Sequence, residues 1–477
     1  MRFNKVMFII PAQQFYYPDF PHAGIGYLSE FLIKHGIDNS TIDMRLGYTL
    51  EQALKKIKKF NPDLVAVSLT TYNRDIGYKV VDTLKEKGFT VFAGGPHVST
   101  LKTQVLRECK ADFGVKLEGE FPLLELCKGK DLREIQNLIF RDGNNIIENE
   151  NRPFIHNLDE LPFPKYEKCE FDKYKNSSIS LVTSRGCPYQ CTFCSVKLAS
   201  GMPFRSRTSD NVLEEMKYWN NKGFKYFHII DDNFTLNKKR VIAISDKIIE
   251  SGLKVTIACD GVRADMVDQE VLTKMKQAGF KYVSFGVEGG NNKVLQAVKK
   301  GESIEQIDDA IKLSTELGFD VFLFFQVGNQ SETFEDVQDS INLALKYPIC
   351  GANFYNTVPY PGTELYDYVK EKGLFIIPPE EYIKEIPYFG DEPVFATPEF
   401  SAEERKKALK LARIASRKIK RKALKRRLSK LGTFGDLAYL ALRYEFVKDV
   451  VLNKVLMKSE ITRKFVGSQT AKIFVEN

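Results

Sequence analysis

The sequence lacks the features of a membrane-spanning or disulfide-stapled protein. No window holds about 18 uninterrupted apolar residues, the length that a transmembrane helix needs. Of the eight cysteines, five are scattered singly and three lie within eight residues, which is not a disulfide framework. The apolar run at residues 6–10 ends at Pro11, and no small-residue cleavage site follows, so it predicts a buried first strand rather than a signal peptide. We therefore expect a cytoplasmic protein without disulfides.

The net charge of +8 on 477 residues is unevenly distributed. Residues 401–430 contain 14 Lys and Arg and only two acidic residues, Glu403 and Glu404, a local net charge of +12. The other 447 residues together carry −4. Because the basic character belongs to one segment, we expect no nucleic-acid partner for the chain as a whole. The length allows about three domains of roughly 150 residues.

Short apolar runs alternate with helix-length amphipathic stretches over residues 1–137. This rhythm predicts βαβ units and a parallel sheet covered on both faces, a Rossmann-like α/β domain. The expected strands are 6–10, 40–44, 63–69, 90–93 and 113–117, and the expected helices are 23–35, 50–60 and 75–87. Residues 138–177 then predict a hairpin, with strands 138–140 and 145–147, and an extended linker.

Polar and glycine residues follow three of these strands. In open parallel sheets, ligands bind beyond the carboxyl ends of the strands. No GxGxxG follows the first strand, which disfavours a dinucleotide. The Gly-Gly-Pro sequence at 94–96 taken alone is also compatible with a simple turn. The candidate ligand residues at this edge are Ser68, Thr70, Gly94, Gly95, His97, Glu118, Gly119 and Glu120.

The middle of the chain carries a C-x3-C-x2-C loop made by Cys187, Cys191 and Cys194. A [4Fe–4S] cluster is held by Cys thiolates and normally takes four. Three cysteines on one loop, without a nearby fourth, predict a cluster with one iron left open, where a substrate or cofactor binds. Zinc modules usually use four ligands and repeat CxxC pairs, and a redox CxxC motif leaves Cys187 unexplained. Gly186 and Pro188 fit a loop wrapped tightly around a cluster.

This loop resembles the cluster loop of the radical S-adenosylmethionine (SAM) superfamily. The resemblance implies that the open iron chelates the methionine part of SAM, which is then cleaved to a 5′-deoxyadenosyl radical. It also implies that Phe193, the aromatic residue before the third cysteine, lies near the adenine. A low-potential electron donor, such as flavodoxin or ferredoxin, is the implied partner.

Six strands in barrel rhythm extend the resemblance to a partial (β/α)6 TIM-type barrel over 178–375. The expected strands are 178–182, 226–230, 254–258, 282–286, 320–325 and 351–356. Barrel enzymes work at the carboxyl ends of strands. By resemblance, the SAM-binding residues there are Asp231, Asp232, Arg263, Glu288, Gly328 and Glu332. Relatives often have Gly-Leu-Pro-Gly-Glu where this chain has Gly328-Asn-Gln-Ser-Glu332, so Ser331 replaces a glycine. Arg263 and Glu288 are alternatively a buried ion pair without a ligand role.

An α/β domain ahead of such a barrel resembles the cobalamin-binding class of this superfamily. The resemblance implies a B12 site at the strand-end residues given above for the first domain. Many cobalamin domains carry Asp-x-His-x-x-Gly, whose His ligates cobalt. This chain has Asp19-Phe-Pro-His22-Ala-Gly24, off by one residue, so we expect His22 not to ligate. His97 is better placed, although a turn role beside Pro96 is equally compatible.

The last hundred residues, 376–477, predict a wrap rich in Pro and aromatic residues and then two helices. A capping box at Ser401 opens a basic amphipathic helix to about residue 431, and an apolar helix is expected over 436–456. Such a pair is typical of a membrane-surface element, which suggests peripheral contact with anionic lipid. The alternatives are a helical pair docked on the barrel, or an acidic or RNA partner.

The two cofactors together predict a methyltransferase. By resemblance, cobalamin carries a methyl group from one SAM, and the radical from a second SAM removes hydrogen from an unactivated carbon of a small, lipid-like or pigment-like molecule. The alternative enzyme is a non-methylating radical SAM cyclase, oxygenation or rearrangement enzyme. A non-enzymatic iron–sulfur electron-transfer protein would need a fourth Cys ligand.

Overall fold

The computed structural model describes residues 2–12, 20–174, 178–384 and 390–433. The chain divides into two compact units, residues 1–224 with 359–386 and residues 225–358 with 387–477. The predicted division at 137, 177 and 375 remains a prediction, since the compact units cut the chain elsewhere. Each unit is described by itself below.

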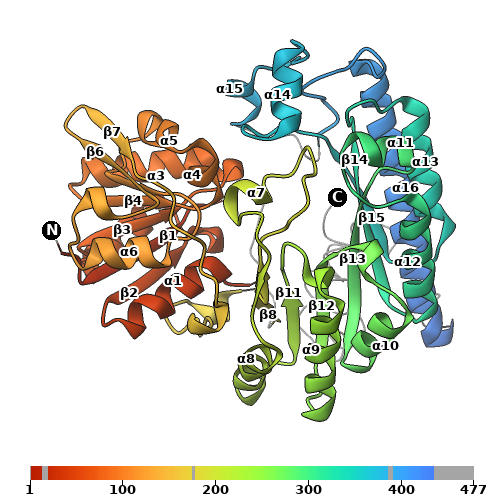
Figure 1. The fold of residues 1–477 in the computed structure, drawn as a ribbon, viewed down its shortest axis with the longest axis horizontal. Coiled ribbons are helices and arrows are strands. Elements are labelled where there is room, and N and C mark those ends of the chain that lie inside the picture. The colour runs from red at the N-terminus through yellow and green to blue at the C-terminus, as the bar shows by residue number, and fades with distance from the viewer. Residues whose placement is uncertain (1, 13–19, 175–177, 385–389, 434–477) are drawn as a thin grey trace. The chain divides into compact units, whose positions relative to one another are not determined.

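A seven-stranded sheet forms the centre of the first unit, in the order β2-β1-β3-β4-β5-β6-β7 (Figure 1). The pairings from β2 to β5 are parallel, as predicted. The predicted hairpin forms as β6 and β7 and adds two antiparallel strands to the edge at β5, so the sheet is mixed. The strands are β1 Lys5–Ile10, β2 Asp38–Asp43, β3 Leu64–Ser68, β4 Val91–Gly94, β5 Phe113–Val115, β6 Leu138–Asp142 and β7 Asn145–Glu148.

Helices cover both faces of this sheet because alternate strand residues are apolar on both sides. Phe8 and Ala66 face α1 and α6, whereas Ile9 and Val67 face the opposite set of helices. The helices are α1 Ala23–Lys34 and α6 Glu120–Cys127 on one face, and α2 Leu50–Phe60, α3 Arg74–Glu86, α4 Pro96–Leu101 and α5 Thr103–Glu108 on the other. The predicted doubly covered α/β domain is therefore confirmed.

Two short helices, α4 and α5, were not expected from the sequence. The Gly-Gly-Pro sequence is more than a turn, because Pro96 is the first residue of α4. Proline is favoured at that position, where its missing N–H and fixed φ are both tolerated. Lys102 separates α4 from α5 with a φ of +52°, so the helical pattern is interrupted there.

The remaining elements of the first unit surround the cysteine loop. The first expected barrel strand forms as β8, and a two-stranded ribbon of β9 and β10 follows it. These elements are β8 Ser178–Leu181, β9 Ser184–Arg185, α7 Val196–Ala199, β10 Arg205–Ser206, α8 Ser209–Asn221, α14 Glu364–Glu371 and α15 Pro379–Tyr382.

The second unit carries the other five expected barrel strands, which pair in parallel in chain order. They are β11 Tyr226–Ile229, β12 Thr256–Val262, β13 Phe280–Glu288, β14 Asp320–Val327 and β15 Gly351–Asn356. The helices between them are α9 Lys238–Glu250, α10 Gln269–Gln277, α11 Asn292–Ala297, α12 Ile304–Glu316 and α13 Phe334–Lys346. Among the described strands the pairings run in a line without closing, as a partial barrel predicts.

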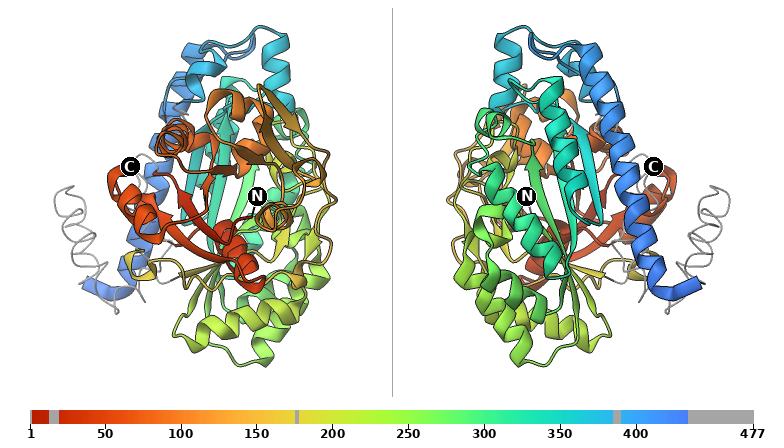
Figure 2. Two further views of the ribbon diagram at one scale, coloured as in Figure 1. Left: turned by 90° about the vertical axis from the view of Figure 1, so that its left-hand side faces the viewer. Right: turned by 90° about the vertical axis from the view of Figure 1, so that its right-hand side faces the viewer.

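One long helix, α16 Ala402–Leu428, ends the described part of the second unit (Figure 2). Ser401 caps it with the predicted capping box, in which Glu404 reaches back to the Ser401 N–H. The helix packs on β15 and α13 through a stripe of buried residues, namely Arg405, Ala408, Leu409, Ala412, Ala415, Ser416, Ile419 and Ala423. The predicted helix 436–456 lies outside the described residues.

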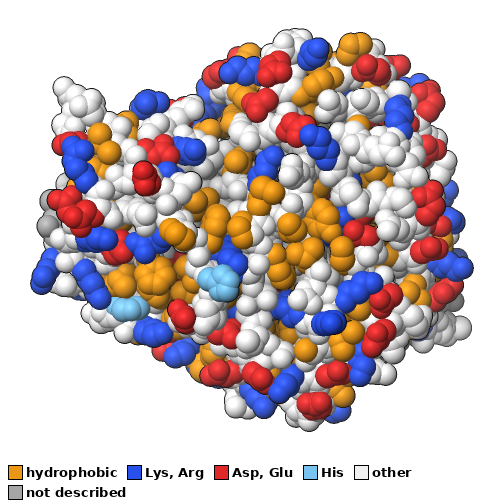
Figure 3. Space-filling model, in the orientation of Figure 1, with side chains coloured by type: hydrophobic (Ala, Val, Ile, Leu, Met, Phe, Trp, Pro, Cys, Tyr) orange, Lys and Arg blue, Asp and Glu red, His pale blue; other side chains and the backbone are white. Residues whose placement is uncertain are grey.

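Charged side chains of both signs are interspersed on the face seen in Figure 3. No helix within the described ranges is long and apolar enough to cross a membrane. Cys109, Cys127, Cys259 and Cys350 are buried, as is typical of small apolar core residues, whereas Cys169 is half-buried.

Candidate functional site

The loop that carries the three cysteines is closed at its base by the β9–β10 ribbon. Gly186 follows β9 with a φ of +87°, and a Cβ there would lie 2.3 Å from the carbonyl oxygen of Pro203. The Cys187 N–H donates to the carbonyl of Gly201 at 3.2 Å. Only glycine fits this close crossing, which explains the residue before the first cysteine.

The three cysteines lie at different depths on this loop. Cys191 is buried, whereas Cys187 and Cys194 are half-buried, as is Phe193. The Leu365 N–H donates to the carbonyl of Thr192 at 2.9 Å, which fastens the loop to α14. Among the described residues, no group of three His, Cys, Asp or Glu side chains is placed to hold one metal ion. A [4Fe–4S] cluster binds each thiolate through a different iron, so three cluster ligands need not converge on one point, and this donor set fits it.

Two arginines flank the cysteine loop and bind the segment after β5. Arg185 pairs with Glu118 at 3.0 Å and with Glu120 at 2.8 Å, and Arg205 pairs with Glu118 at 2.5 Å. The carboxylates of Glu118 and Glu120 were predicted to line a ligand site. In the structure they bind these guanidinium groups, and Gly119 lies half-buried between them.

The strand ends of β3 and β4 form a tight backbone cradle at the predicted ligand edge. Gly95 has a φ of +103°, and a Cβ there would lie 2.6 Å from the carbonyl oxygen of Leu69. Thr70 caps the following turn by accepting from the Asn73 N–H, and Ser68 is buried beside it. Gly95 is thus required by the close approach of the Leu69 backbone, whereas a Cβ at Gly94 would lie 3.1 Å from a side-chain carbon of Val115.

His97 and His22 both have structural partners. His97 is fully buried, with Nδ1 3.1 Å from Thr71 Oγ1 and Nε2 2.8 Å from Tyr78 OH. Burial lowers the pKa of His97 to about 4, so the ring is neutral. His22 caps α1 by accepting from the Ile25 N–H, which is consistent with the prediction that His22 does not ligate cobalt. The placement of His97 favours the turn role over a ligand role.

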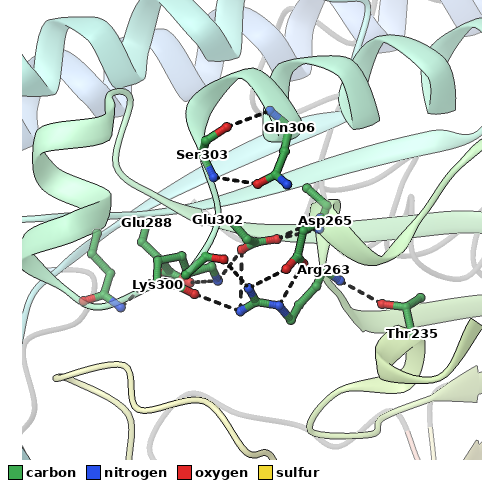
Figure 4. Close-up of polar contacts among 11 residues, drawn as sticks. Thr235, Arg263, Asp265, Glu288, Lys300, Glu302, Ser303 and Gln306 are labelled. Carbon is green, nitrogen blue, oxygen red and sulfur yellow. Dashed lines mark hydrogen bonds and ion pairs between the residues drawn. The ribbon is translucent and has the colours of Figure 1, made fainter.

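In the second unit, Arg263 is the centre of a buried charged network (Figure 4). Its guanidinium donates to both carboxylate oxygens of Asp265, at 3.0 and 3.1 Å, and to the carbonyls of Lys300 and Gly301. Glu302 lies 3.8 Å from Arg263 and 3.5 Å from Lys300, and it accepts from the Ala264 N–H. Burial raises the pKa of Glu302. Lys300 and Glu302 were not predicted, because no motif marks the loop after α11.

Glu288 ends β13 in a left-handed conformation, with a φ of +67°. Its carboxylate pairs with Lys300 at 3.3 Å and accepts from Gln326 at 3.0 Å. The sequence also allowed a direct ion pair between Arg263 and Glu288. In the structure, Arg263 and Glu288 are instead linked by successive ion pairs through Glu302 and Lys300. A non-glycine residue with positive φ at a strand end is typical of functional sites, where strain is held by the surroundings.

The turn Gly328–Glu332 carries Ser331 at the position where relatives often have glycine. Ser331 adopts a φ of +61°, the left-handed conformation that glycine favours. Glu332 is fully buried and closes the turn by accepting from the N–H groups of Gly328 and Asn329 at 2.6 and 2.8 Å. The buried guanidinium of Arg405 packs closely against this turn, because a Cβ added at Gly328 would lie 2.6 Å from it.

Asp231 and Asp232 directly follow β11, with Asp231 buried and Asp232 half-buried. The backbone of Gly261 approaches so closely that a Cβ there would lie 2.4 Å from the Asp231 carbonyl oxygen. Sequence reasoning missed a neighbouring chain of polar side chains across three strands. In it, His228 lies 2.7 Å from Asp260, and Ser284 donates to Asp260 at 2.8 Å.

Comparison with known proteins agrees with this arrangement. Family models for the radical SAM superfamily and the B12 binding domain match residues 181–344 and 16–126. An uncharacterized methyltransferase of Pyrococcus horikoshii is 33% identical over 83% of this chain and 87% of its own. Cytidylyl-2-hydroxyethylphosphonate methyltransferase of Streptomyces wedmorensis is 25% identical over 81% of this chain and 85% of its own. The solved structure of the cobalamin-dependent S-adenosylmethionine radical enzyme OxsB is similar in fold, with a TM-score of 0.72 at 17% identity, covering 97% of this chain and 74% of that one.

The two domains and these relatives define a radical SAM enzyme with a B12-binding domain. The chain belongs to the cobalamin-binding class of the radical SAM superfamily. The predicted enzyme class is confirmed, as are the cofactors of that class: a [4Fe–4S] cluster, S-adenosylmethionine and cobalamin.

Proposed function

We propose that the chain is a methyltransferase that moves a methyl group from SAM, by way of cobalamin, to an unactivated carbon of a small molecule. The observation that carries the proposal is that the cysteine loop and the strand-end edge of the B12-binding domain belong to one compact unit and bind each other through Arg185. The two methyltransferase relatives support the choice of reaction. When bound, the cofactors supply the radical and the methyl group, and the protein supplies their placement.

We assign the cofactor contacts as follows. Cys187, Cys191 and Cys194 hold the cluster, and the backbone cradle at Ser68, Thr70, Gly94, Gly95 and Gly119 lies against cobalamin. The residues assigned to SAM are Phe193, Asp231, Asp232, Arg263, Glu288 and Gly328. Since the carboxylates of Glu118, Glu120 and Glu332 and the ring of His97 bind protein groups, they act by holding loops in place.

The first test is the corrin and iron content of protein purified anaerobically from cobalamin-supplied cells. Near-stoichiometric corrin with about four irons per chain supports the proposal. Iron without corrin contradicts it and favours the non-methylating alternative. Products then separate the reactions: S-adenosylhomocysteine together with 5′-deoxyadenosine indicates methylation, whereas 5′-deoxyadenosine alone indicates a cyclase, oxygenation or rearrangement enzyme. Reduced flavodoxin or ferredoxin is the proposed electron source for this assay.

A second part of the proposal concerns anionic membranes and a lipid-like or pigment-like substrate. The apolar stripe of α16 is buried against β15 and α13, so it cannot insert into a bilayer while the helix is docked. Outside this stripe, Ile414 is 60% exposed and Leu411 is 37% exposed, and Ile414 lies in a groove with basic side chains from Arg417 to Lys425. Such a surface supports peripheral contact through charge, with Ile414 as the more exposed apolar anchor.

Flotation with vesicles containing phosphatidylserine tests this contact. We expect binding at low salt that falls as salt rises, and a further loss in Ile414→Glu. Leu411→Glu, at a less exposed position of the same helix, is the matched variant. No flotation at low salt would contradict the membrane proposal and leave the methyltransferase proposal intact.

A further inference from the structure

The two arginines that flank the cysteine loop lie directly opposite each other. In the β9–β10 ribbon, Arg185 is the register partner of Arg205. Like charges facing each other across an antiparallel pair are destabilising. The ribbon nevertheless closes the 19-residue stretch 186–204 that contains all three cysteines. Something outside the ribbon must therefore offset this repulsion.

The segment after β5 supplies the two compensating charges. One carboxylate oxygen of Glu118 accepts from both arginines, and Glu120 accepts from Arg185. The second oxygen of Glu118 accepts from the Ile155 N–H at 2.8 Å. All four side chains are at most 16% exposed, so two positive and two negative charges balance in a buried cluster. Because Glu118 is shared, any displacement of its carboxylate would remove a partner from both arginines at once.

Aromatic rings and a strained residue fix the cluster further. Arg185 lies 5.1 Å from the ring centroid of Tyr27, and Arg205 lies 4.6 Å from that of Phe154. Leu117, just before Glu118, has a φ of +61°, and its N–H is held by the Ser99 hydroxyl at 2.8 Å. Such strain persists only where surrounding contacts determine the conformation. The segment is thus held in one position relative to the cysteine loop.

We propose that Arg185 and Glu118 are positioning residues that fix the spacing between the iron–sulfur cluster and the corrin. This inference rests on the proposed function, because it needs both cofactors in the first unit. The loop that would hold the cluster and the loop that would lie beside the corrin are joined by this shared carboxylate. Buried charge pairs tolerate little rearrangement, since moving one partner leaves the other uncompensated.

Pulsed dipolar EPR between the reduced cluster and the cobalt(II) form of the corrin measures the spacing itself. The wild-type holoenzyme should give one narrow distance distribution. In Arg185→Lys and Glu118→Gln we expect a shift or broadening of about 1 Å, a displacement that can lower a reaction rate about 100-fold. Lys116→Met is the matched control. Lys116 lies two residues before Glu118 and forms a partly buried ion pair with Glu148, which is not part of the cysteine loop. Unchanged distributions in both variants, or an equal change in the control, would overturn the inference.

A second measurement decides the matter if a variant loses its cluster. Hydrogen exchange of the apo chain reports on residues 117–121 and 186–204 without any cofactor. Both segments should exchange faster in Arg185→Lys than in Lys116→Met, together and by a similar factor. Equal exchange in the two variants refutes the coupling. Should the wild type bind no corrin, the proposed function fails, and hydrogen exchange still tests the ion-pair cluster.

Discussion

The buried carboxyl of Glu332 should make the stability of the second unit depend on pH. One oxygen of this carboxyl accepts two backbone N–H groups, from Gly328 and Asn329. Burial raises the pKa of Glu332 from its ordinary value of 4.5 to about 7, although these hydrogen bonds and the charge of Arg405 oppose the rise. The folded chain therefore binds the Glu332 proton more tightly than the unfolded chain.

The sign and size of the effect follow from this difference in proton affinity. The contribution of Glu332 to stability is fully present below pH 4.5 and is lost as the pH rises through 7. A pKa rise of this size corresponds to roughly 3 kcal/mol. Most of it, about 2 to 3 kcal/mol, falls between pH 5 and pH 8. In a unit of this size that is a change in Tm of about 5 to 10 °C.

Substitution by glutamine isolates this contribution. Glu332→Gln removes the titrating proton and retains an oxygen that can accept both N–H groups. The Tm of the apo variant minus that of the wild type, measured at pH 5, 6, 7 and 8, should rise by about 5 to 10 °C across the series. The matched control is Glu335→Gln, at an exposed carboxyl on the first turn of α13. A Tm difference for Glu332→Gln that stays flat with pH would refute the reasoning.

Three further substitutions test other features of the two units. Ser331→Gly should stabilise the second unit by about 0.5 to 1 kcal/mol, because glycine adopts the left-handed conformation without strain and the Ser331 side chain is exposed. An unchanged Tm would contradict this expectation. Arg405→Met should cost about 3 kcal/mol, read as a lower Tm, since Arg405 is buried against Phe395 and donates to its carbonyl at 3.1 Å. His97→Gln should leave corrin content and the cobalt(II) EPR spectrum as in the wild type, because both ring nitrogens bind protein groups. A changed cobalt spectrum would show that His97 reaches the metal.

Local patterns predicted the elements well because their causes are local. The helix predicted over 50–60 is α2 to the residue, since Thr49 and Gln52 form a capping box around a strongly amphipathic stretch. The strand at 351–356 is likewise β15. The helix α4 was missed because the two glycines before Pro96 are typical of turns.

The contacts within the candidate site could not be predicted from local patterns. Arg185 and Glu118 are 67 positions apart, and Arg263 and Lys300 are 37 apart, and no spacing rule connects either pair. Arg405 lies in a run of basic residues that predicts a solvated face, yet it is fully buried. Its burial depends on the rings of Phe395 and Phe400, which stack against the guanidinium.

Polar residues at strand ends predict where a cofactor site lies, but they do not identify the atoms that reach a ligand. Glu118, Glu332 and His97 were all predicted to contact a cofactor, and in the structure each binds protein groups. A large cofactor has to meet loops that are already rigid, since ordering them on binding would weaken affinity. Charged groups at such edges are therefore needed first to fix the backbone that the cofactor touches. On this argument, the charges at such edges mark residues that hold the loops in place, and Gly95 belongs with them, because its missing Cβ makes room for the Leu69 carbonyl oxygen.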